Sequence, residues 1–138
     1  MRIVVTGASG LVGRAIVRRT GATGLTHRDL DITDESAVRE TVARLRPDMV
    51  INCAVIGVDD CETDPQLARA INIEGPRNLA RVAPAIVHFS TNYVLDPVNV
   101  YGRTKLEGEQ AVLDANSASL VVRTSWVFGS GKESFLST

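Results

Sequence analysis

A glycine-rich turn directly after the first apolar run constrains this sequence more than any other feature. Gly7, Gly10 and Gly13 fall in the segment TGASGLVG, at positions 6–13, behind the short run 3–5. Gly7 allows a tight turn, Gly10 lets the backbone approach a phosphate, and Gly13 lets the next helix pack close to the strand. Free N–H groups and the positive end of that helix favour a bound anion. Pyrophosphate contacts are therefore predicted at Gly7, Ser9, Gly10, Leu11, Val12 and Gly13.

Beyond this turn, short β-branched runs alternate with amphipathic segments, a pattern typical of a parallel sheet flanked by helices. Strands are expected over 2–6, 23–26, 49–54, 86–90 and 120–123. Helices are expected over 11–19, from a cap at 33–34 through 45, over 65–80 and over 101–114. These elements predict an α/β fold, a Rossmann-type doubly wound parallel sheet with flanking helices. Residues 1–138 are interpreted as a single dinucleotide-binding domain.

Composition narrows the partners and the compartment. Fifteen basic and sixteen acidic residues leave a formal charge of -1, which favours neither nucleic acid nor an anionic membrane as a partner. Met1 leads straight into an apolar run, so we expect no signal peptide, and no apolar stretch approaches the length of a membrane helix. Cys53 and Cys61 form no metal or disulfide pattern, so we expect free thiols, no metal site and a cytoplasmic protein.

The segment after the second expected strand bears on which dinucleotide is bound. An acidic residue at the strand tip binds the ribose hydroxyls of NAD, whereas an arginine favours the 2′-phosphate of NADP. Arg28 stands near that tip, which favours NADP, but Asp29 follows it and leaves NAD open. Asp31 and Ile32 are placed to reach the adenine edge.

A tyrosine and a lysine four positions apart form the candidate catalytic group. Tyr101 and Lys105 would emerge from one face of a helix. An ammonium beside a phenol lowers the phenol's pKa, so we expect Tyr101 to act as a general acid or base near neutral pH. A hydroxyl from Ser90 or Thr91, at the end of the preceding strand, could hydrogen-bond a substrate oxygen.

Seven segments in order extend the pattern over nearly the whole chain. They are TGASGLVG (6–13), LDITD (30–34), VINCAV (50–55), AINIEGPRNLA (70–80), HFSTNYVLD (88–96), VYGRTKLEGE (100–109) and VRTSWVFG (122–129). With them the chain resembles the extended short-chain dehydrogenase/reductase family, and within it the dTDP-4-dehydrorhamnose reductase branch.

This resemblance implies NADPH-dependent reduction of the C4 keto group of a nucleotide-linked 6-deoxy sugar. Tyr101 would donate the proton, Lys105 would hold the nicotinamide ribose and tune Tyr101, and Thr91 would orient the keto oxygen. The family pattern places further cofactor contacts at Cys53, Ala54, Val55 and Ser90, and substrate contacts at Asn92 and Trp126. A homodimer is the assembly to test first.

The chain also departs from the family. Asn92 replaces a usual aspartate, and we expect the substrate-binding region that follows in relatives to be absent from this chain. The connections between expected elements near Thr20, near 83–84 and near 96–97 are shorter than in relatives. We therefore expect that residues are missing from the sequence at these places; the alternative is a domain whose loops are shorter. These departures leave two other functions open: a non-catalytic nucleotide-binding regulatory subunit, or another sugar-nucleotide epimerase or dehydratase of the family.

Overall fold

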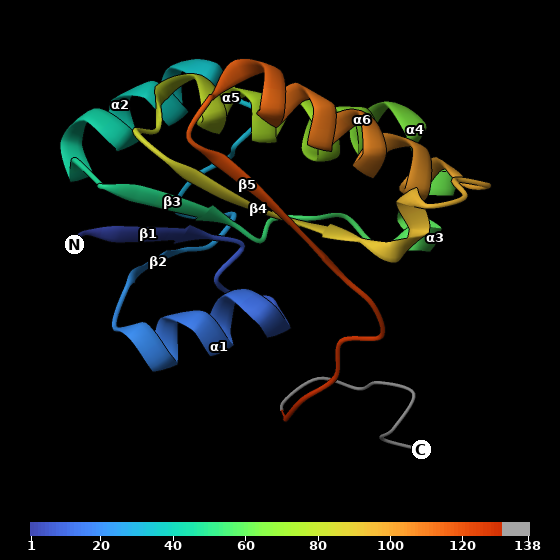
Figure 1. Cartoon of the computed structure of the whole chain (residues 1–138), viewed down its shortest axis with the longest axis horizontal. Coiled ribbons are helices and arrows are strands. Elements are labelled where there is room, and N and C mark those ends of the chain that lie inside the picture. The colour runs from blue at the N-terminus through green and yellow to red at the C-terminus, as the bar shows by residue number, and fades with distance from the viewer. Residues whose placement is uncertain (131–138) are drawn as a thin grey trace.

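Five parallel strands form one sheet at the centre of the molecule. The computed structural model describes residues 1–130, and in that range the strand order is β2-β1-β3-β4-β5 (Figure 1). The strands are β1 (Ile3–Thr6), β2 (Thr23–Leu25), β3 (Met49–Asn52), β4 (Ile86–Thr91) and β5 (Ser119–Thr124). Because the chain passes from β2 across β1 to β3, the order reverses between β1 and β3, and ligands of such sheets bind at the carboxyl ends of the strands at this point.

Helices lie on both faces of the sheet, so the predicted doubly wound α/β fold is confirmed. Helix α1 (Leu11–Thr20) lies alone on one face, and α2 (Glu35–Leu45), α5 (Gly75–Val82) and α6 (Val100–Ala115) cover the other (Figure 1). The shorter α3 (Val58–Thr63) and α4 (Pro65–Arg69) contact α6. Local signals set these bounds: Asp34 and Asn99 cap α2 and α6 by accepting hydrogen bonds from Ala37 N and Gly102 N.

The hydrophobic core lies between the sheet and the layer that contains α2, α5 and α6. Val50 and Ile86, on neighbouring strands, point into this layer and pack with Leu79 of α5 and Val112 of α6. All four side chains are at most 1% exposed. Strand residues alternate between faces, so the buried positions of one strand align with those of the next. This layer fixes α6, and with it the predicted catalytic helix, against the sheet.

The expected helix over 65–80 is interrupted in the structure. Asp64 caps α4, and after α4 the chain passes through a π-helical turn, η1 (Ala70–Glu74), before α5 begins. Helix α3 was not predicted at all, because its six residues are too few to show a helical period. The π turn brings the Asn72 carbonyl close to α6, where a Cβ at Gly108 would lie 2.0 Å from it. Gly108 therefore permits the close contact of these two segments.

The short connections close without a break. Between α1 and β2, Gly21 adopts a left-handed φ of 68°, and its N–H donates to Val17 O. Between β4 and α6, a 3-10 turn, η2 (Asn92–Val94), leads through a compact segment to the Asn99 cap. Gly102 packs against the Tyr93 carbonyl, so this segment lies directly on the start of α6. A shortened loop of this kind is sterically compatible with the fold.

Candidate functional site

The glycine turn between β1 and α1 has the close backbone contacts that its sequence predicts. Gly7 has a φ of 69°, and a Cβ there would lie 2.5 Å from Ala54 N, so only glycine fits. A Cβ at Gly13 would lie 2.3 Å from Gly7 O, so Gly13 permits α1 to approach the strand end. At Gly10 a Cβ would lie 3.3 Å from Gly7 O, so a side chain there needs only a small shift of the turn. The close approach of a phosphate to Gly10 stays a prediction.

The first turn of α1 is open to an anion. Gly10 is its N-cap and offers no side-chain cap, and no acidic residue occupies the first turn. The first N–H groups of a helix have no partner inside the helix, and together with the dipole they attract negative charge. Such a helix start, next to the reversal of strand order, suits a pyrophosphate.

A buried polar ladder holds the strand ends beneath this turn. Thr6 Oγ1 donates to Asn52 Oδ1 at 2.7 Å, and Asn52 Nδ2 lies 3.0 Å from His88 Nδ1. Asn52 Oδ1 also accepts from Ala54 N at 3.1 Å. The ladder therefore joins β1, β3 and β4 at the edge where the site lies. Burial lowers the pKa of His88 to about 3, with a smaller contribution from Lys105, so its imidazole is neutral.

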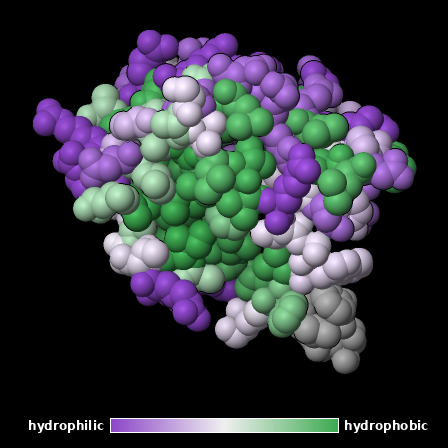
Figure 2. Space-filling view, in the orientation of Figure 1, coloured by the Kyte–Doolittle hydropathy of each residue, from purple (hydrophilic) through white to green (hydrophobic). Residues whose placement is uncertain are grey.

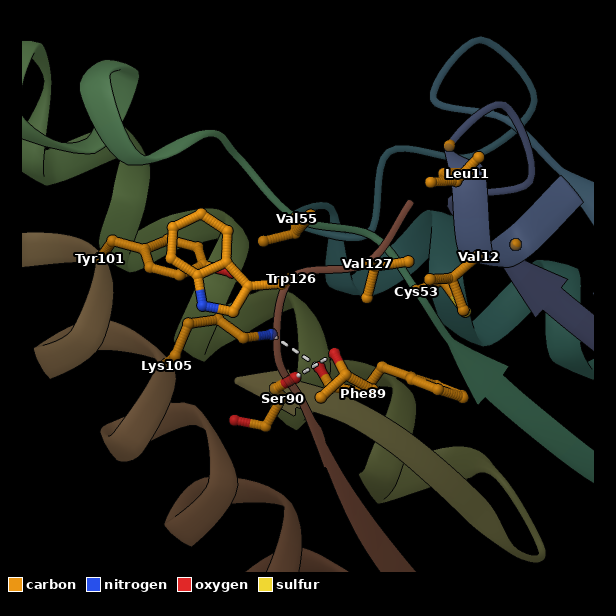
Figure 3. Close-up of a pocket in the computed structure, with 13 residues that line it drawn as sticks. Leu11, Val12, Cys53, Val55, Phe89, Ser90, Tyr101, Lys105, Trp126 and Val127 are labelled. Atoms are coloured by element: carbon orange, nitrogen blue, oxygen red, sulfur yellow. Dashed lines mark hydrogen bonds between the residues drawn. The ribbon is translucent and has the colours of Figure 1, made fainter. Parts of the chain in front are cut away.

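A pocket of about 440 Å³ opens beside the glycine turn. Figure 3 shows Leu11 and Val12 on one side and Tyr101 and Lys105 of α6 on the other, with Trp126 near Tyr101. The lining residues are Gly10, Leu11, Val12, Gly13, Cys53, Val55, Phe89, Ser90, Tyr101, Lys105, Thr124, Trp126 and Val127. The structure thus brings the predicted pyrophosphate turn and the predicted catalytic pair to one cavity.

Lys105 is buried and anchored at the wall of this pocket. Its side chain is 2% exposed, and Nζ donates to the Phe89 carbonyl at 2.7 Å (Figure 3). Burial lowers the pKa of Lys105 to about 8, opposed chiefly by the carboxylate of Glu109. At neutral pH the side chain is therefore mostly an ammonium ion.

Tyr101 differs from its expected behaviour. We expected the neighbouring ammonium to lower its pKa, but burial raises the pKa of Tyr101, and a hydrogen bond with Thr91 only partly offsets this. The expectation was wrong because burial of the phenol has the largest effect, while the Lys105 ammonium donates its hydrogen bond to the Phe89 carbonyl. A phenol with a raised pKa stays protonated at neutral pH and is suited to donate a proton.

A second cavity, of about 260 Å³, adjoins the first and shares Tyr101, Thr124, Trp126 and Val127 with it. Thr91 and Asn92, predicted as catalytic and substrate residues, both line it. Trp126 has a left-handed φ of 48°, which is costly for a non-glycine residue and often occurs at functional sites. Tyr101 therefore stands where the two cavities meet.

Several predicted cofactor residues lie outside the pocket lining. Arg28, Ser9 and Asp31 are exposed, and Ile32 packs against Gly75. The Asp31 carboxylate accepts hydrogen bonds from Thr33, which lowers its pKa. Gly7 and Ala54 are also absent from the lining and pack backbone to backbone instead. The roles assigned to these residues stay predictions.

Some lining residues were not predicted. Phe89 and Thr124 line the pocket, and Tyr93 lines the second cavity with its ring 5.6 Å from that of Tyr101. The register of β4 against β5 explains why Phe89 and Thr124 line the pocket. Phe89 pairs with Val122 and Thr124 pairs with Thr91, at the same edge of the sheet. That pairing becomes visible only when the order of the strands is known.

Residues 1–130 contain neither a metal-binding cluster nor a membrane-spanning helix. Their histidine, cysteine and carboxylate side chains nowhere gather in a group of three or more that could hold a metal ion. None of their helices combines the length and the apolar character needed to cross a membrane. Cys53 and Cys61 are free thiols.

Comparison with known proteins links this geometry to curated sequences. The chain is 46% identical to a dTDP-4-dehydrorhamnose reductase of Mycolicibacterium smegmatis, over 94% of this chain and 47% of that protein. It is 42% identical to a probable dTDP-4,6-dihydroxy-2-methyloxan-3-one 4-ketoreductase of Streptomyces antibioticus, over 100% of this chain and 55% of that protein. The second alignment spans 163 positions, so that relative has residues without a counterpart here. The chain spans about half the length of these relatives.

Solved structures agree with the sequence relatives. A dTDP-4-dehydrorhamnose reductase from Bacillus anthracis, in complex with NADP, superposes with a TM-score of 0.92 at 32% identity, over 99% of this chain and 57% of that one. Another from Clostridium acetobutylicum gives 0.91 at 37% identity, over 99% and 57%. The family profile for the RmlD substrate binding domain matches residues 1–138. This chain therefore belongs to the RmlD substrate binding domain family, whose relatives include dTDP-4-dehydrorhamnose reductases.

Proposed function

We propose that this chain carries the cofactor site and the proton donor of an NADPH-dependent reductase that acts on the C4 keto group of a nucleotide-linked 6-deoxy sugar. One observation carries the proposal: Tyr101 and Lys105 share a pocket with the open start of α1, which begins at Leu11. A dinucleotide on that helix start would place its far end toward α6. The names of the relatives and the NADP complex of the Bacillus anthracis structure support the same reading.

The residues present fit a dinucleotide. Gly10 has no side chain to block a pyrophosphate, and the uncapped start of α1 favours its charge. Arg28 supports NADP over NAD, since its exposed guanidinium can pair with a 2′-phosphate. Asp29 does not oppose this strongly, because its carboxylate accepts hydrogen bonds from Thr26 N and Oγ1 at 2.7 and 2.8 Å. NAD remains the alternative cofactor.

The chemistry divides between the cofactor and the chain. Bound NADPH would supply a hydride to the keto carbon. Tyr101 would give its phenolic proton to the keto oxygen, so that the ketone becomes an alcohol and a solvent proton later restores the phenol. Thr91, whose hydroxyl interacts with Tyr101, would orient that oxygen. The Lys105 ammonium would stabilise the transient phenolate and hold the ribose beside it.

The second cavity is our candidate for the sugar. It adjoins the cofactor pocket at Tyr101, and Trp126 supplies an aromatic surface on which an apolar sugar face can pack. Asn92 would contribute an amide at this cavity, where relatives of the branch usually have a carboxylate. Its Oδ1 lies 3.4 Å from Thr91 Oγ1, a weak contact that leaves the amide able to bind a sugar hydroxyl.

The activity test follows the absorbance of reduced nicotinamide after the protein is mixed with NADPH and a dTDP-4-keto-6-deoxy sugar. We expect oxidation of NADPH and a product reduced at C4, and a loss of at least about 100-fold in Tyr101→Phe. Tyr93→Phe is the comparison variant: Tyr93 lines the sugar cavity but not the cofactor pocket, so this change should act on the KM for the sugar and leave kcat close to that of the wild type. NADPH binding without turnover would favour the regulatory subunit, and a product with an inverted or eliminated centre would favour an epimerase or dehydratase.

Cofactor choice has its own test. Removing the cation with Arg28→Ala should weaken NADPH binding about tenfold and leave NADH binding unchanged. An unchanged ratio of the two affinities would remove Arg28 from the site.

The free thiols of Cys53 and Cys61 suit a reducing compartment, so we place the reaction in the cytoplasm. A homodimer stays our proposed assembly, to be checked by sedimentation.

A further inference from the structure

A glutamate one turn beyond Lys105 continues the functional face of α6. Tyr101, Lys105 and Glu109 follow one another at intervals of four, so their side chains lie along one side of the helix. Glu109 is 4% exposed although it carries a charge. Buried carboxylates are rare unless they are paired, and the pairing of this one is therefore informative.

The partner of Glu109 is an arginine on the neighbouring strand β5. Arg123 Nε donates to Oε1 at 2.9 Å, and Nη2 donates to Oε2 at 2.7 Å, a bidentate arrangement that fixes the carboxylate. Burial alone would raise the pKa of Glu109, but the hydrogen bonds from Arg123 reverse the effect, and the pKa is lowered. Glu109 is thus an oriented anion at neutral pH.

We propose that Glu109, held by Arg123, is a positioning residue for Lys105: its buried carboxylate, one helical turn away on the same face of α6, keeps the ammonium charged at the wall of the pocket. The role of Lys105 toward the cofactor rests on the proposed function. The interaction between Glu109 and Lys105 does not depend on it.

The other groups around Lys105 cannot supply this charge. The thiols of Cys53 and Cys61 also contribute to its electrostatic environment. Burial raises the pKa of Cys53 to about 12 and raises that of Cys61, so both are neutral at pH 7. The imidazole of His88, on β4, is neutral because burial lowers its pKa to about 3.

Along α6, the phenol of Tyr101 is neutral as well, since its pKa is raised. Phe89, on β4, offers a carbonyl dipole and no net charge. Arg123 on β5 is a cation, but its side chain is 46% exposed, so solvent screens its charge more than that of the buried Glu109. Among the groups that the structure shows around the ammonium of Lys105, Glu109 therefore provides the negative charge.

The sequence allows a direct measurement, because it contains only two lysines, Lys105 and Lys132. Lysine labelled with ¹³C at Cε gives two NMR signals, and Lys132→Arg assigns them. Titration then reports the pKa of Lys105 in the whole chain, with neither cofactor nor substrate present. If the chain is not a reductase, this measurement can still be made and interpreted. If Glu109 has no effect on Lys105, the reductase proposal still stands.

Two variants break the same ion pair in opposite ways. Glu109→Gln removes the anion, so the pKa of Lys105 should fall by about one unit. Arg123→Met removes the cation and leaves the carboxylate, so the pKa of Lys105 should rise. Glu107→Gln is the matched control: it removes an exposed α6 carboxylate, paired with Arg69 at 3.0 Å, and should leave the pKa unchanged.

Two results would overturn the proposal. One is a pKa of Lys105 that is the same in Glu109→Gln as in the wild type. The other is an equal fall in Glu109→Gln and Arg123→Met, which would mean that only the packing of α6 on β5 matters. Should Glu109→Gln fail to fold, Arg123→Met decides alone, since a raised pKa of Lys105 in that variant supports the proposal and a fall or no change contradicts it.

Discussion

His88 lies at the β4 end of the polar ladder beneath the glycine turn, and its burial links stability to pH. The pKa of the folded protein's His88 is about 3, whereas an unfolded histidine titrates near 6.5. Between these values the unfolded state binds the extra proton, so stability falls as the pH drops, by up to about 1.4 kcal/mol per pH unit. Urea unfolding between pH 7 and pH 4.5 should show this slope.

The variant His88→Gln isolates this contribution. Glutamine keeps an acceptor for Asn52 Nδ2 but cannot titrate. The variant should be less stable than the wild type at pH 7, and the difference should shrink steadily toward pH 4.5. Parallel stability curves for the two proteins would show that His88 takes up no proton on unfolding.

Lys105 and Tyr101 set the expected pH dependence of turnover. The ammonium is present below pH 8 and is lost as the pH rises through the Lys105 pKa of about 8, while the raised pKa of Tyr101 keeps its proton available over the same range. The rate of reduction should therefore decline above pH 8, as a pH profile of kcat would show. A profile that stays flat to pH 9.5 would exclude a role for the Lys105 charge.

At this scale the sequence predicted which residues meet, but not all their electrostatic properties. The spacing of Tyr101 and Lys105 and their place after β4 were enough to predict a shared pocket with the glycine turn. The direction of the Tyr101 pKa was not predictable, because it depends chiefly on how deeply the fold buries the phenol. Glu109 was visible only as part of a family segment, since its partner lies on another element.

Helix α1 and its glycines give a prediction at the scale of elements. Gly13→Ala places a Cβ 2.3 Å from Gly7 O, so it should lower the free energy of unfolding by about 1–3 kcal/mol. Gly10→Ala meets Gly7 O at only 3.3 Å and should cost less than about 1 kcal/mol. Denaturant unfolding of both variants measures the difference.

The affinity for NADPH tests the role of Gly10 separately from its effect on stability. Gly10→Ala should weaken NADPH binding about tenfold although the protein stays folded, because its methyl group would occupy the path of the pyrophosphate. Fluorescence titration with NADPH checks this. Equal affinity for Gly10→Ala and the wild type would mean that the phosphates do not approach the backbone at Gly10.

Element boundaries were predicted well where a cap or a glycine marks them. Asp34 marks the start of α2 in the sequence as in the structure, and the predicted end of the first helix at 19 lies one residue before the end of α1, which Gly21 caps. The interruption of the 65–80 helix was missed, because the π turn at 70–74 carries apolar residues that also fit a regular helix. Its cause is tertiary, the close contact of Asn72 with Gly108 of α6.

At the scale of the whole molecule, the two faces of the sheet are covered unequally. On the α1 face, paired positions become more exposed with distance from the helix: Val5 is 0% exposed, Ile51 and Val87 are half-buried, and Leu120 is 58% exposed. Figure 2 shows the broad hydrophobic area that results where the sheet lies in Figure 1. Large apolar areas of this kind mark contact surfaces.

The 138-residue chain should therefore self-associate through this face. Leu120→Lys adds a charge at its most exposed strand position and should shift sedimentation toward the monomer. Leu113→Lys is the control, because Leu113 is 48% exposed on α6, which covers the other face. A wild type that stays monomeric at all concentrations, or an equal effect of both variants, would contradict this reading.

The overall architecture was predictable because each level of the pattern agrees with the next. Apolar runs, caps and the glycine turn all indicated a doubly wound sheet, and the structure has one. The unequal cover of its faces was not predictable from local patterns, since Leu120 and Val122 read like any strand of a sheet buried on both sides.

The central claim is that a dinucleotide lies on the start of α1 and reaches the Tyr101–Lys105 wall. Backbone NMR of the ¹⁵N-labelled chain, titrated with NADP⁺, tests it most directly. We expect the largest shifts at the amides of 10–13, with further shifts at 53–55 and at 101–105. Shifts confined to other parts of the sheet, or none at saturating NADP⁺, would contradict the account.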